Sequence, residues 1–575
     1  MADGGGQSDS DENKSKNCLN SRSQVSMNPG EDLHRHDSIQ TTAETFIYGP
    51  LTRKYYNHFE KYSKKKSYLT TDDVRRALNE YHLYPTKSQI YEALHTYGDQ
   101  PENAVLPFSK FCVLCAALED GYKKSVPSLV PLSRKRTKSK RHKRKVEGLV
   151  NNFQVFLGGA CNPTTWRADT AIPYLKKHNI TFYNPQVAKW RPELIEIEEQ
   201  AKSIAQVHFF VIHHFTRCIA SLVEAAYLAG SGSQLILVIK PLPDPSVEIM
   251  GEVISDTEYS SLTRAQAFIQ DLVERRRLPV FDDIQVALQC TSTVIHEGKS
   301  VPDLTLADGA QPVKFTHIRV ADKYIKIKEA FNAVDVGHKG SIGLDDASLA
   351  FKMLTNSELH RTSLPSSKHS HDAQFSLSEF CCLVTEYKYG PQSPIQQFKS
   401  FLHSIFHPCK RSRNEEPADN VFSSRDIFLG GSCGDTNWRT EIAIPLLRKH
   451  GISYFNPQTP YWSERYIPIE ANIKENCYLL LFIITGDTRA TAAMLEAGYY
   501  IGLGCDVVLC IENVKEHATI EGEELSSQAV KDYNRGRMYL MELANKEAVE
   551  VYDDIKDAVA SGVQRIIDIR RNPSY

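Results

Sequence analysis

The 575-residue chain is long enough for about three to five domains, and its 41% apolar and 24% charged residues are ordinary for globular proteins. It has no apolar run of about 18 residues, so we expect no membrane span, and its polar start is not a targeting helix. The 13 scattered cysteines favour reduced thiols and an intracellular protein, cytoplasmic and/or nuclear. The net charge of −2 excludes no class of partner, because the charge is unevenly distributed.

The first 120 residues divide into a polar tail and a helical domain. Residues 1–42 contain few apolar residues and no period, which predicts a disordered tail. Over residues 43–120 apolar residues recur at helical spacing. Two stretches, residues 68–74 and 106–111, look like the end of an EF-hand loop and the start of its exiting helix. We therefore expect an EF-hand-like domain here.

Neither loop of this domain has the ligands that calcium requires. An EF-hand loop places oxygen ligands at positions one, three, five and twelve and a glycine at six. The first loop has an aromatic residue and two cations at positions one, three and five, and the second has a proline at three and a lysine at twelve. The residues concerned are Tyr62, Lys64 and Lys66 in the first loop and Pro101 and Lys110 in the second, beside the possible ligands Asp99 and Asn103. We expect the EF-hand fold without its ion chemistry.

The densest charge of the chain lies in a predicted linker at residues 121–150. Lysine and arginine dominate residues 133–145. Such a run can be a nuclear import signal that binds import receptors, an arm that binds polyanions, or a solvated linker. The residues alone leave these three alternatives open.

A first α/β module is predicted at residues 151–298. It alternates apolar runs of strand length with helical patterns, and the third run is apolar except for His208, as is typical of a parallel strand covered on both faces. Five such units predict a doubly wound, five-stranded parallel sheet of the flavodoxin or Rossmann type. The expected strands are residues 153–157, 181–183, 207–212, 235–239 and 279–281, and the expected helices are residues 171–177, 195–205, 221–229, 265–274 and 282–290.

The second half of the chain repeats this order. The expected segments are a linker at residues 299–316, an EF-hand-like helical domain at 317–390, a linker at 391–424 and a second α/β module at 425–575. The fold class is therefore α/β plus all-α, with two α/β modules alternating with two helical modules.

The two calcium loops of the second helical domain are also spoiled. The third loop has Asp335, Gly340 and Asp346 at positions one, six and twelve, but a glycine and a lysine at three and five. The fourth loop has Lys368 at position one. We expect no metal at any of the four loops, and no cofactor.

The two α/β modules are copies of each other. Residues 155–167 read Val-Phe-Leu-Gly-Gly-Ala-Cys-Asn-Pro-Thr-Thr-Trp-Arg, and residues 427–439 read Ile-Phe-Leu-Gly-Gly-Ser-Cys-Gly-Asp-Thr-Asn-Trp-Arg, 272 residues later. From Phe156 to Ile239 the copies align without a gap, with roughly two positions in five identical. The period is far too long for a solenoid, which indicates a duplicated domain pair.

The ligand edge of each module can be located from the sequence. In doubly wound sheets ligands bind beyond the carboxyl ends of the strands, where the strand order reverses. With the order 2-1-3-4-5, that point lies between strands one and three. The residues expected to bind a ligand there are Gly430, Gly431, Trp438, Arg439, Asn456 and Asp487 in the second copy and Gly158, Gly159, Trp166, Arg167 and Asn184 in the first.

Two of these residue types have two interpretations each. The tryptophans could stack on a base or close the core. The arginines could hold a phosphate through a bidentate fork or pair with a nearby acid such as Glu441. The sequence leaves both pairs of alternatives open.

The Phe-Leu-Gly-Gly and Trp-Arg motifs and the Leu-Glu-Ala-Gly-Tyr run at residues 495–499 resemble the nucleoside 2-deoxyribosyltransferase superfamily, in its "-like" branch. The resemblance covers both α/β modules. In that family a helix-borne glutamate attacks the anomeric carbon of a deoxynucleoside and forms a glycosyl ester, through an oxocarbenium-like transition state. The resemblance implies that Glu496 and Glu224 are the nucleophiles of the two copies.

Both copies depart from the family's pattern. The family places a tyrosine hydroxyl near the nucleophile from strand one, and here that position is Phe428 or Phe156. A family aspartate six residues before the nucleophile corresponds to Ala490 or Cys218. These departures put catalysis in doubt.

Two functions remain open on this basis. The first is a non-catalytic or weakly catalytic regulatory protein in signalling, with nucleoside- or nucleotide-binding domains and protein partners. The alternative is an enzyme that cleaves an N-glycosidic bond, such as a nucleoside deoxyribosyltransferase or a nucleotide or NAD hydrolase, with a glutamate nucleophile.

Overall fold

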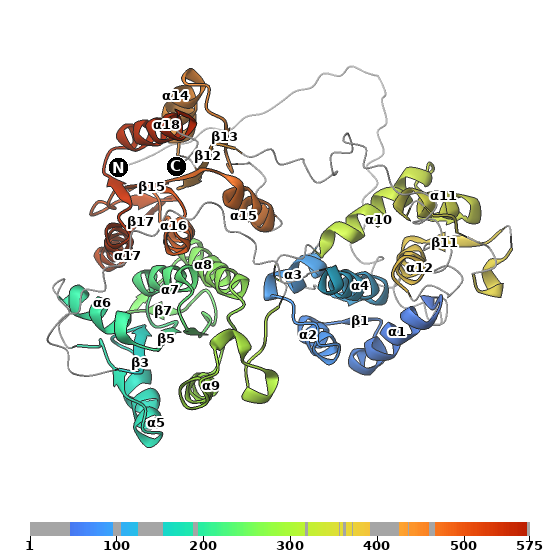
Figure 1. The fold of residues 1–575 in the computed structure, drawn as a ribbon, viewed down its shortest axis with the longest axis horizontal. Coiled ribbons are helices and arrows are strands. Elements are labelled where there is room, and N and C mark those ends of the chain that lie inside the picture. Colours follow the sequence, from blue (N-terminus) through green and yellow to red (C-terminus); the bar gives the residue numbers. More distant parts are fainter. Residues whose placement is uncertain are drawn as a thin grey trace, which may run out of the picture. The chain divides into compact units, whose positions relative to one another are not determined.

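The computed structural model describes residues 46–95, 105–124, 153–187, 194–314, 316, 320–355, 357–359, 364–370, 372–390, 425–434, 436–458 and 466–571 (Figure 1). Several predicted features lie outside the described residues. They are the tail at 1–42, the basic run at 133–145, the loop with Asp99, Pro101 and Asn103, and the linker at 391–424.

The first α/β module is a five-stranded parallel sheet with the strand order β4-β3-β5-β6-β9. This is the predicted order 2-1-3-4-5, and it follows from the buried apolar strands β5 and β6 at the centre. The strands are β3 (Val155–Gly159), β4 (Phe182–Tyr183), β5 (Val207–Ile212), β6 (Leu235–Ile239) and β9 (Val280–Phe281). The helices are α5 (Ile172–Lys177), α6 (Leu194–Ile204), α7 (Ile219–Ser231), α8 (Asp256–Arg275) and α9 (Ile284–Glu297).

The second α/β module repeats this sheet with the order β13-β12-β14-β15-β18. Its strands are β12 (Ile427–Gly431), β13 (Tyr454–Phe455), β14 (Leu479–Ile484), β15 (Val507–Ile511) and β18 (Glu550–Tyr552). Its helices are α14 (Ile444–Lys449), α15 (Tyr466–Asn476), α16 (Thr491–Leu503), α17 (Ser527–Lys546) and α18 (Ile555–Arg571). Each module also has a β-hairpin of two short strands before its longest helix. In the first module β7 (Glu248–Ile249) pairs with β8 (Glu252–Val253) before α8, and in the second β16 (Thr519–Ile520) pairs with β17 (Glu523–Glu524) before α17.

Some boundaries differ from the predicted ones. The first strand was expected to end before the glycine pair, but β3 runs through Gly159, because Gly158 and Gly159 pair in register with Phe210 and Val211. The helix α8 begins about nine residues earlier than expected, where the Ser255 side chain accepts from the Glu258 amide as an N-cap. Its first turns are polar, so they show no apolar period.

The helical modules consist of helix–loop–helix units joined by short antiparallel strands. The first contains α1 (Pro50–Ser63), α2 (Thr71–Glu80), α3 (Lys87–His95) and α4 (Phe108–Lys124), with β1 (Tyr68–Leu69) paired to β2 (Leu106–Pro107). The second contains α10 (Ala321–Val334), α11 (Leu344–Thr355) and α12 (Leu377–Tyr389), with β10 (Ser341–Gly343) paired to β11 (Gln374–Ser376).

The two helical modules share one hydrophobic core, in which α4 and α1 contact α12. A buried carboxylate joins them as well. Glu386 of α12 accepts hydrogen bonds from the Thr52 amide at 2.7 Å and from the Thr52 hydroxyl at 2.8 Å, at the first turn of α1. A carboxylate at a helix N-terminus satisfies amides that have no partner within the helix.

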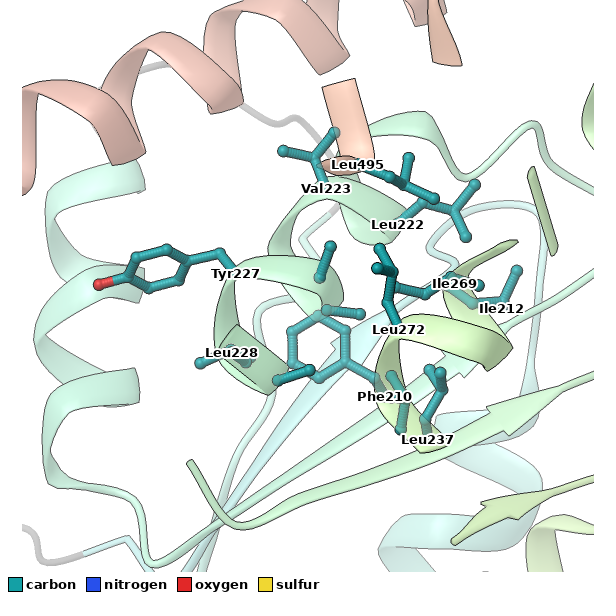
Figure 2. Packing of buried hydrophobic residues seen from close by; sticks show 14 of the residues in the cluster. Phe210, Ile212, Leu222, Val223, Tyr227, Leu228, Leu237, Ile269, Leu272 and Leu495 are labelled. Carbon is teal, nitrogen blue, oxygen red and sulfur yellow. The ribbon is translucent and has the colours of Figure 1, made fainter. Parts of the chain in front are cut away.

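The two α/β modules also share a core, formed where α7 meets α16 and α17. Figure 2 shows Leu222 and Val223 of α7 next to Leu495 of α16. The helices approach closely at Gly230 and Gly502. A Cβ on Gly230 would lie 2.2 Å from the Tyr499 carbonyl oxygen, and a Cβ on Gly502 would lie 2.3 Å from that of Tyr227.

These glycine contacts are reciprocal, because the same two positions meet in each copy. Gly502 and Tyr499 follow Gly230 and Tyr227 by 272 residues. In a two-fold interface, if residue i of one copy contacts residue j of the other, then residue j of the first copy contacts residue i of the second. The duplicated modules are therefore packed as a symmetric pair within one chain.

No helix in the described parts of the chain is long and apolar enough to cross a bilayer.

Candidate functional site

The glycine pair shapes the end of strand one in both copies. Gly159 and Gly431 have φ angles of +101° and +109°, and an added Cβ would lie 2.2 Å or less from the backbone oxygen of Val211 or Ile483. Only glycine fits such a turn. The amides that follow, on Ala160 and Ser432, donate to those same oxygens at 2.8 and 2.7 Å. These two amides are therefore bonded to strand three.

The other glycine of the pair makes room for an aromatic ring. A Cβ on Gly158 would lie 2.3 Å from the Phe210 ring, and a Cβ on Gly430 would lie 2.6 Å from the Phe482 ring. In the first copy Phe156 stacks on Phe210 with ring centroids 6.1 Å apart and on Tyr183 at 5.6 Å. Aromatic side chains therefore fill the face of the sheet beside the glycine pair.

The predicted Trp-Arg residues are buried and bond to the main chain. Arg167 is fully buried and donates to the carbonyl oxygens of Leu157 at 3.1 Å, Gly159 at 3.1 Å and Ala160 at 2.5 Å. The Trp166 indole N–H donates to Ala160 as well. The guanidinium thus satisfies carbonyls of the strand end and fixes the path of the turn.

The second copy repeats this arrangement. Arg439 is fully buried and donates to the carbonyl oxygens of Leu429, Gly431 and Ser432 at 3.1, 3.3 and 2.6 Å, and Trp438 donates to Ser432 at 3.3 Å. Burial lowers the pKa of both arginines, Arg167 and Arg439. Both guanidinium groups therefore hold the turn after strand one in shape through hydrogen bonds to main-chain oxygens.

Each glutamate at the nucleophile position forms a buried ion pair. Glu224 of α7 accepts from Lys202 of α6 at 2.5 Å, and Glu496 of α16 accepts from Lys474 of α15. Both lysine side chains are almost fully buried. A carboxylate that must attack a sugar needs an accessible oxygen, whereas these carboxylates face a fixed cation.

The ion pairs extend to further carboxylates. Lys202 also pairs with Glu199, and Lys474 pairs with Glu470 at 3.3 Å. Burial opposes the charge of Lys202, but Glu224 and Glu199 raise its pKa above the usual range. Burial raises the pKa of Glu496, and Lys474 opposes this shift.

One carboxyl of the first copy, Glu198, has a pKa displaced toward neutrality. Burial, followed by repulsion from Glu224, raises the pKa of Glu198 to about 7, although Lys202 opposes the shift. A carboxyl with such a pKa exchanges its proton near neutral pH. Perturbed carboxyls of this kind occur both at functional sites and in structural ion-pair networks.

The position of the family's tyrosine is occupied by a phenylalanine that packs against the lysine. The Lys474 ammonium lies 4.6 Å from the Phe428 ring centroid, and the Lys202 ammonium lies 5.6 Å from that of Phe156. Such contacts stabilise a cation over an aromatic face. The side chain that would supply a hydroxyl therefore helps to hold the lysine.

The helix of each glutamate begins at a strained residue. Cys218 and Ala490, the N-cap residues of α7 and α16, have φ angles of 54° and 53° and make no side-chain cap hydrogen bond. Left-handed backbone at a residue other than glycine costs about 1 kcal/mol or more. It recurs in both copies at the position where the family has an aspartate, a residue that tolerates this conformation and caps helices.

The remaining predicted residues lie at the loop edge. Asn184 and Asn456 each accept from the amide two residues later at 3.0 Å, which closes a turn after strand two. In the second copy the Gln458 amide group then donates to the Gly434 carbonyl at 3.0 Å, so the loops after strands one and two are joined. Asp487 is exposed in the loop after β14.

The second copy has a hydroxyl cluster at this edge. The hydroxyls of Ser432 and Thr488 lie 2.6 Å apart, and the Thr485 amide donates to the Ser432 hydroxyl at 3.0 Å. From α17, Arg537 donates to the carbonyl oxygens of Thr485 and Thr488 at 3.1 and 2.7 Å. Arg537 therefore fixes the loop that carries Asp487.

Several of these residues were not predicted from the sequence. Lys202 and Lys474, and likewise Glu198 and Glu470, occupy matching positions 272 residues apart. That recurrence in register was a usable signal for all four. Arg537 had no such signal, because the residue at its place in the first copy is Gln266.

The comparison with protein families agrees with this geometry. Residues 152–242 and residues 424–514 each match a family model described as nucleoside 2-deoxyribosyltransferase like, and together they span about a third of the chain. Each match contains a glycine pair, a Trp-Arg motif and a helix-borne glutamate. The chain matched no curated protein and no solved structure. The predicted resemblance is thus confirmed: each of the two α/β modules is a nucleoside 2-deoxyribosyltransferase-like domain, present in tandem.

Proposed function

We propose that this chain is a non-catalytic or weakly catalytic regulatory protein whose α/β modules bind a nucleoside or nucleotide. The family match supports a nucleoside-binding function. The observation that carries the regulatory part is the buried glutamate–lysine ion pair, which stands in both copies where an enzyme needs a free nucleophile.

The second copy is the better candidate for the ligand. Its edge has the half-buried hydroxyl of Thr488, which bonds to the buried hydroxyls of Ser432 and Thr485, and the exposed carboxylate of Asp487. A carboxylate at such an edge suits the hydroxyl groups of a ribose. In the first copy Asp487 is replaced by Phe215, which is 47% exposed.

The experiment is a binding and cleavage assay with the full-length protein. Deoxynucleosides, nucleoside monophosphates and NAD are titrated by calorimetry, and free base is measured by chromatography in the same samples. We expect saturable, weak binding without base release. Loss of a hydrogen bond to a charged group predicts that Asp487→Ala weakens binding about tenfold, whereas the matched first-copy variant Phe215→Ala leaves it unchanged.

The alternative is an enzyme that cleaves an N-glycosidic bond. What favours it is that Glu224 and Glu496 occupy the same helix position in both family matches. Base release that disappears in Glu496→Gln would establish the enzyme and refute the regulatory proposal. If neither base release nor binding is observed, the proposed nucleoside ligand is refuted. The remaining role of these modules is then to bind protein partners.

A further inference from the structure

The second helical module contains a lysine at the centre of a loop. The Lys368 ammonium lies 2.7 Å from Oε1 of Glu379 and donates to the carbonyl oxygen of Gln374, also at 2.7 Å. It also lies 4.8 Å from the ring centroid of Phe375. The Lys368 side chain is 16% exposed, so these contacts are largely shielded from water.

Its partners are the groups that bind calcium in an EF-hand loop. Counted from Lys368 as position one, Gln374 is at position seven and Glu379 at position twelve. A calcium loop uses the backbone carbonyl at seven and the carboxylate at twelve as metal ligands. Calcium does not fit this loop as it stands, because an ammonium group already contacts both ligands.

We propose that the Lys368 ammonium takes the place of the metal ion in this loop. The other ligand positions of the loop still carry oxygen atoms, from Ser370 at three, Asp372 at five and Ser376 at nine. The loop therefore retains the ligands of a calcium site and closes on a cation that belongs to the chain itself.

The neighbouring loop is closed by hydrogen bonds of its own. Asp335, at its position one, accepts hydrogen bonds from the amides of Lys339 and Gly340, both at 2.9 Å. The two loops are joined by the strand pair in which Ile342 faces Phe375. These contacts join the loops that precede α11 and α12.

This internal cation has a consequence for the other helical module. The helix α12 begins at Glu379's turn, where Oε2 of Glu379 accepts from the Ser376 amide at 2.9 Å, and it carries Glu386, which caps α1. Lys368 thus stabilises the start of the helix that joins the two helical modules. The module acts as a constant scaffold and not as a calcium sensor.

The first test compares thermal unfolding of the full-length protein and two matched variants in a chelator. Lys368→Met removes the ammonium and keeps the aliphatic chain, and we expect its midpoint to fall by about 3 °C or more. Lys339→Met removes an exposed lysine from position five of the neighbouring loop and leaves the midpoint unchanged. An unchanged midpoint in Lys368→Met overturns the proposal.

The second test converts the loop into a calcium site. Calcium loops need glycine at position six, where this chain has Ala373, so the variant is Lys368→Asp with Ala373→Gly. We expect calcium to raise its midpoint with a Kd of about 10⁻⁵ to 10⁻³ M, and to have no effect on the unaltered protein or on Ala373→Gly alone. Calcium binding by the unaltered loop, or no rescue of the converted one, overturns the proposal.

Discussion

The two α/β copies agree in their interior and differ at the edge where their loops meet. Both have a buried arginine on the strand-one turn and a glutamate–lysine pair between two helices. After strand three, however, the first copy has His213, His214 and Phe215, where the second has Thr485, Gly486 and Asp487. Burial, His214 and Lys240 lower the pKa of His213 to about 4, so the His213 side chain is neutral near pH 7.

This difference distinguishes buried residues that stabilise the fold from loop residues that are available to contact a ligand. A buried cation with several carboxylate partners cannot be removed singly without a large loss of stability, so the interior of both copies is constrained. The loop edge contributes little to the core and can differ between the copies at small cost. Ligand selectivity, if the copies differ in it, should therefore follow the edge and not the glutamate.

The largest expected effect on stability comes from removing the buried lysine of one copy. Lys202→Met removes the cation that Glu224 contacts, while Glu199 keeps its pair with Lys546. We expect a loss of about 3–5 kcal/mol in the free energy of unfolding. Denaturant unfolding of the full-length protein measures it. Lys202→Met with Glu224→Gln should recover part of the loss, and a loss below about 1 kcal/mol in the single variant would contradict the ion-pair interpretation.

The packing of the two copies against each other can be broken at a single glycine. Gly502→Ala places a methyl group against the Tyr227 carbonyl, and overpacking of this kind should cost about 3 kcal/mol. Gly343→Ala is the matched control, because a Cβ there meets nothing closer than the Asp346 carboxylate at 3.9 Å. Equal stability of the two variants in the same denaturant titration would show that α7 and α16 are not in close contact.

The smallest expected effect is a pH-dependent contribution of Glu198 to the stability of the first copy. Because the pKa of Glu198 is raised from 4.5 to about 7 in the folded protein, the folded state binds more protons than the unfolded state between these values. The contribution of Glu198 to stability is therefore greatest below pH 4.5 and is lost as the pH rises through 7.

Glu198→Gln keeps the neutral form at every pH. We expect it to raise the free energy of unfolding by about 1–3 kcal/mol at pH 8 and to change little at pH 4. Glu470→Gln, the matched second-copy variant, removes an ion pair with Lys474 and should not stabilise at pH 8. A pH-independent effect of Glu198→Gln would disprove the assignment of the proton to this carboxyl.

The sheet order and the placement of the glutamates were predictable from local patterns. The apolar run of β14, and that of β5 with His208 as its one exception, indicate central parallel strands, and the glycine pair with Trp-Arg marks the first turn. Each of these signals is contained in a few consecutive residues. The resemblance to the family then placed Glu224 and Glu496 on the helices after strand three.

The lysines and the ligand face were harder to predict, because they depend on contacts between distant residues. Lys202 meets Glu224 across 22 residues of sequence, and Phe210 fills the space above Gly158 from a different strand. The sequence of a Trp-Arg motif is the same whether the arginine binds a phosphate or a main-chain carbonyl. Only the fold shows that Arg167 and Arg439 are directed toward the main chain.

The reciprocal contact of Gly230 and Gly502 has a consequence for how the protein responds to its own concentration. A pair of separate subunits with this interface would come apart on dilution, since association is governed by mass action. Here the partner is supplied by the same chain, so its effective concentration is fixed by covalent connection. The two modules are therefore present in a one-to-one ratio at every level of expression. Each module can also change its own side of the interface independently, whereas in a homodimer every substitution appears on both sides.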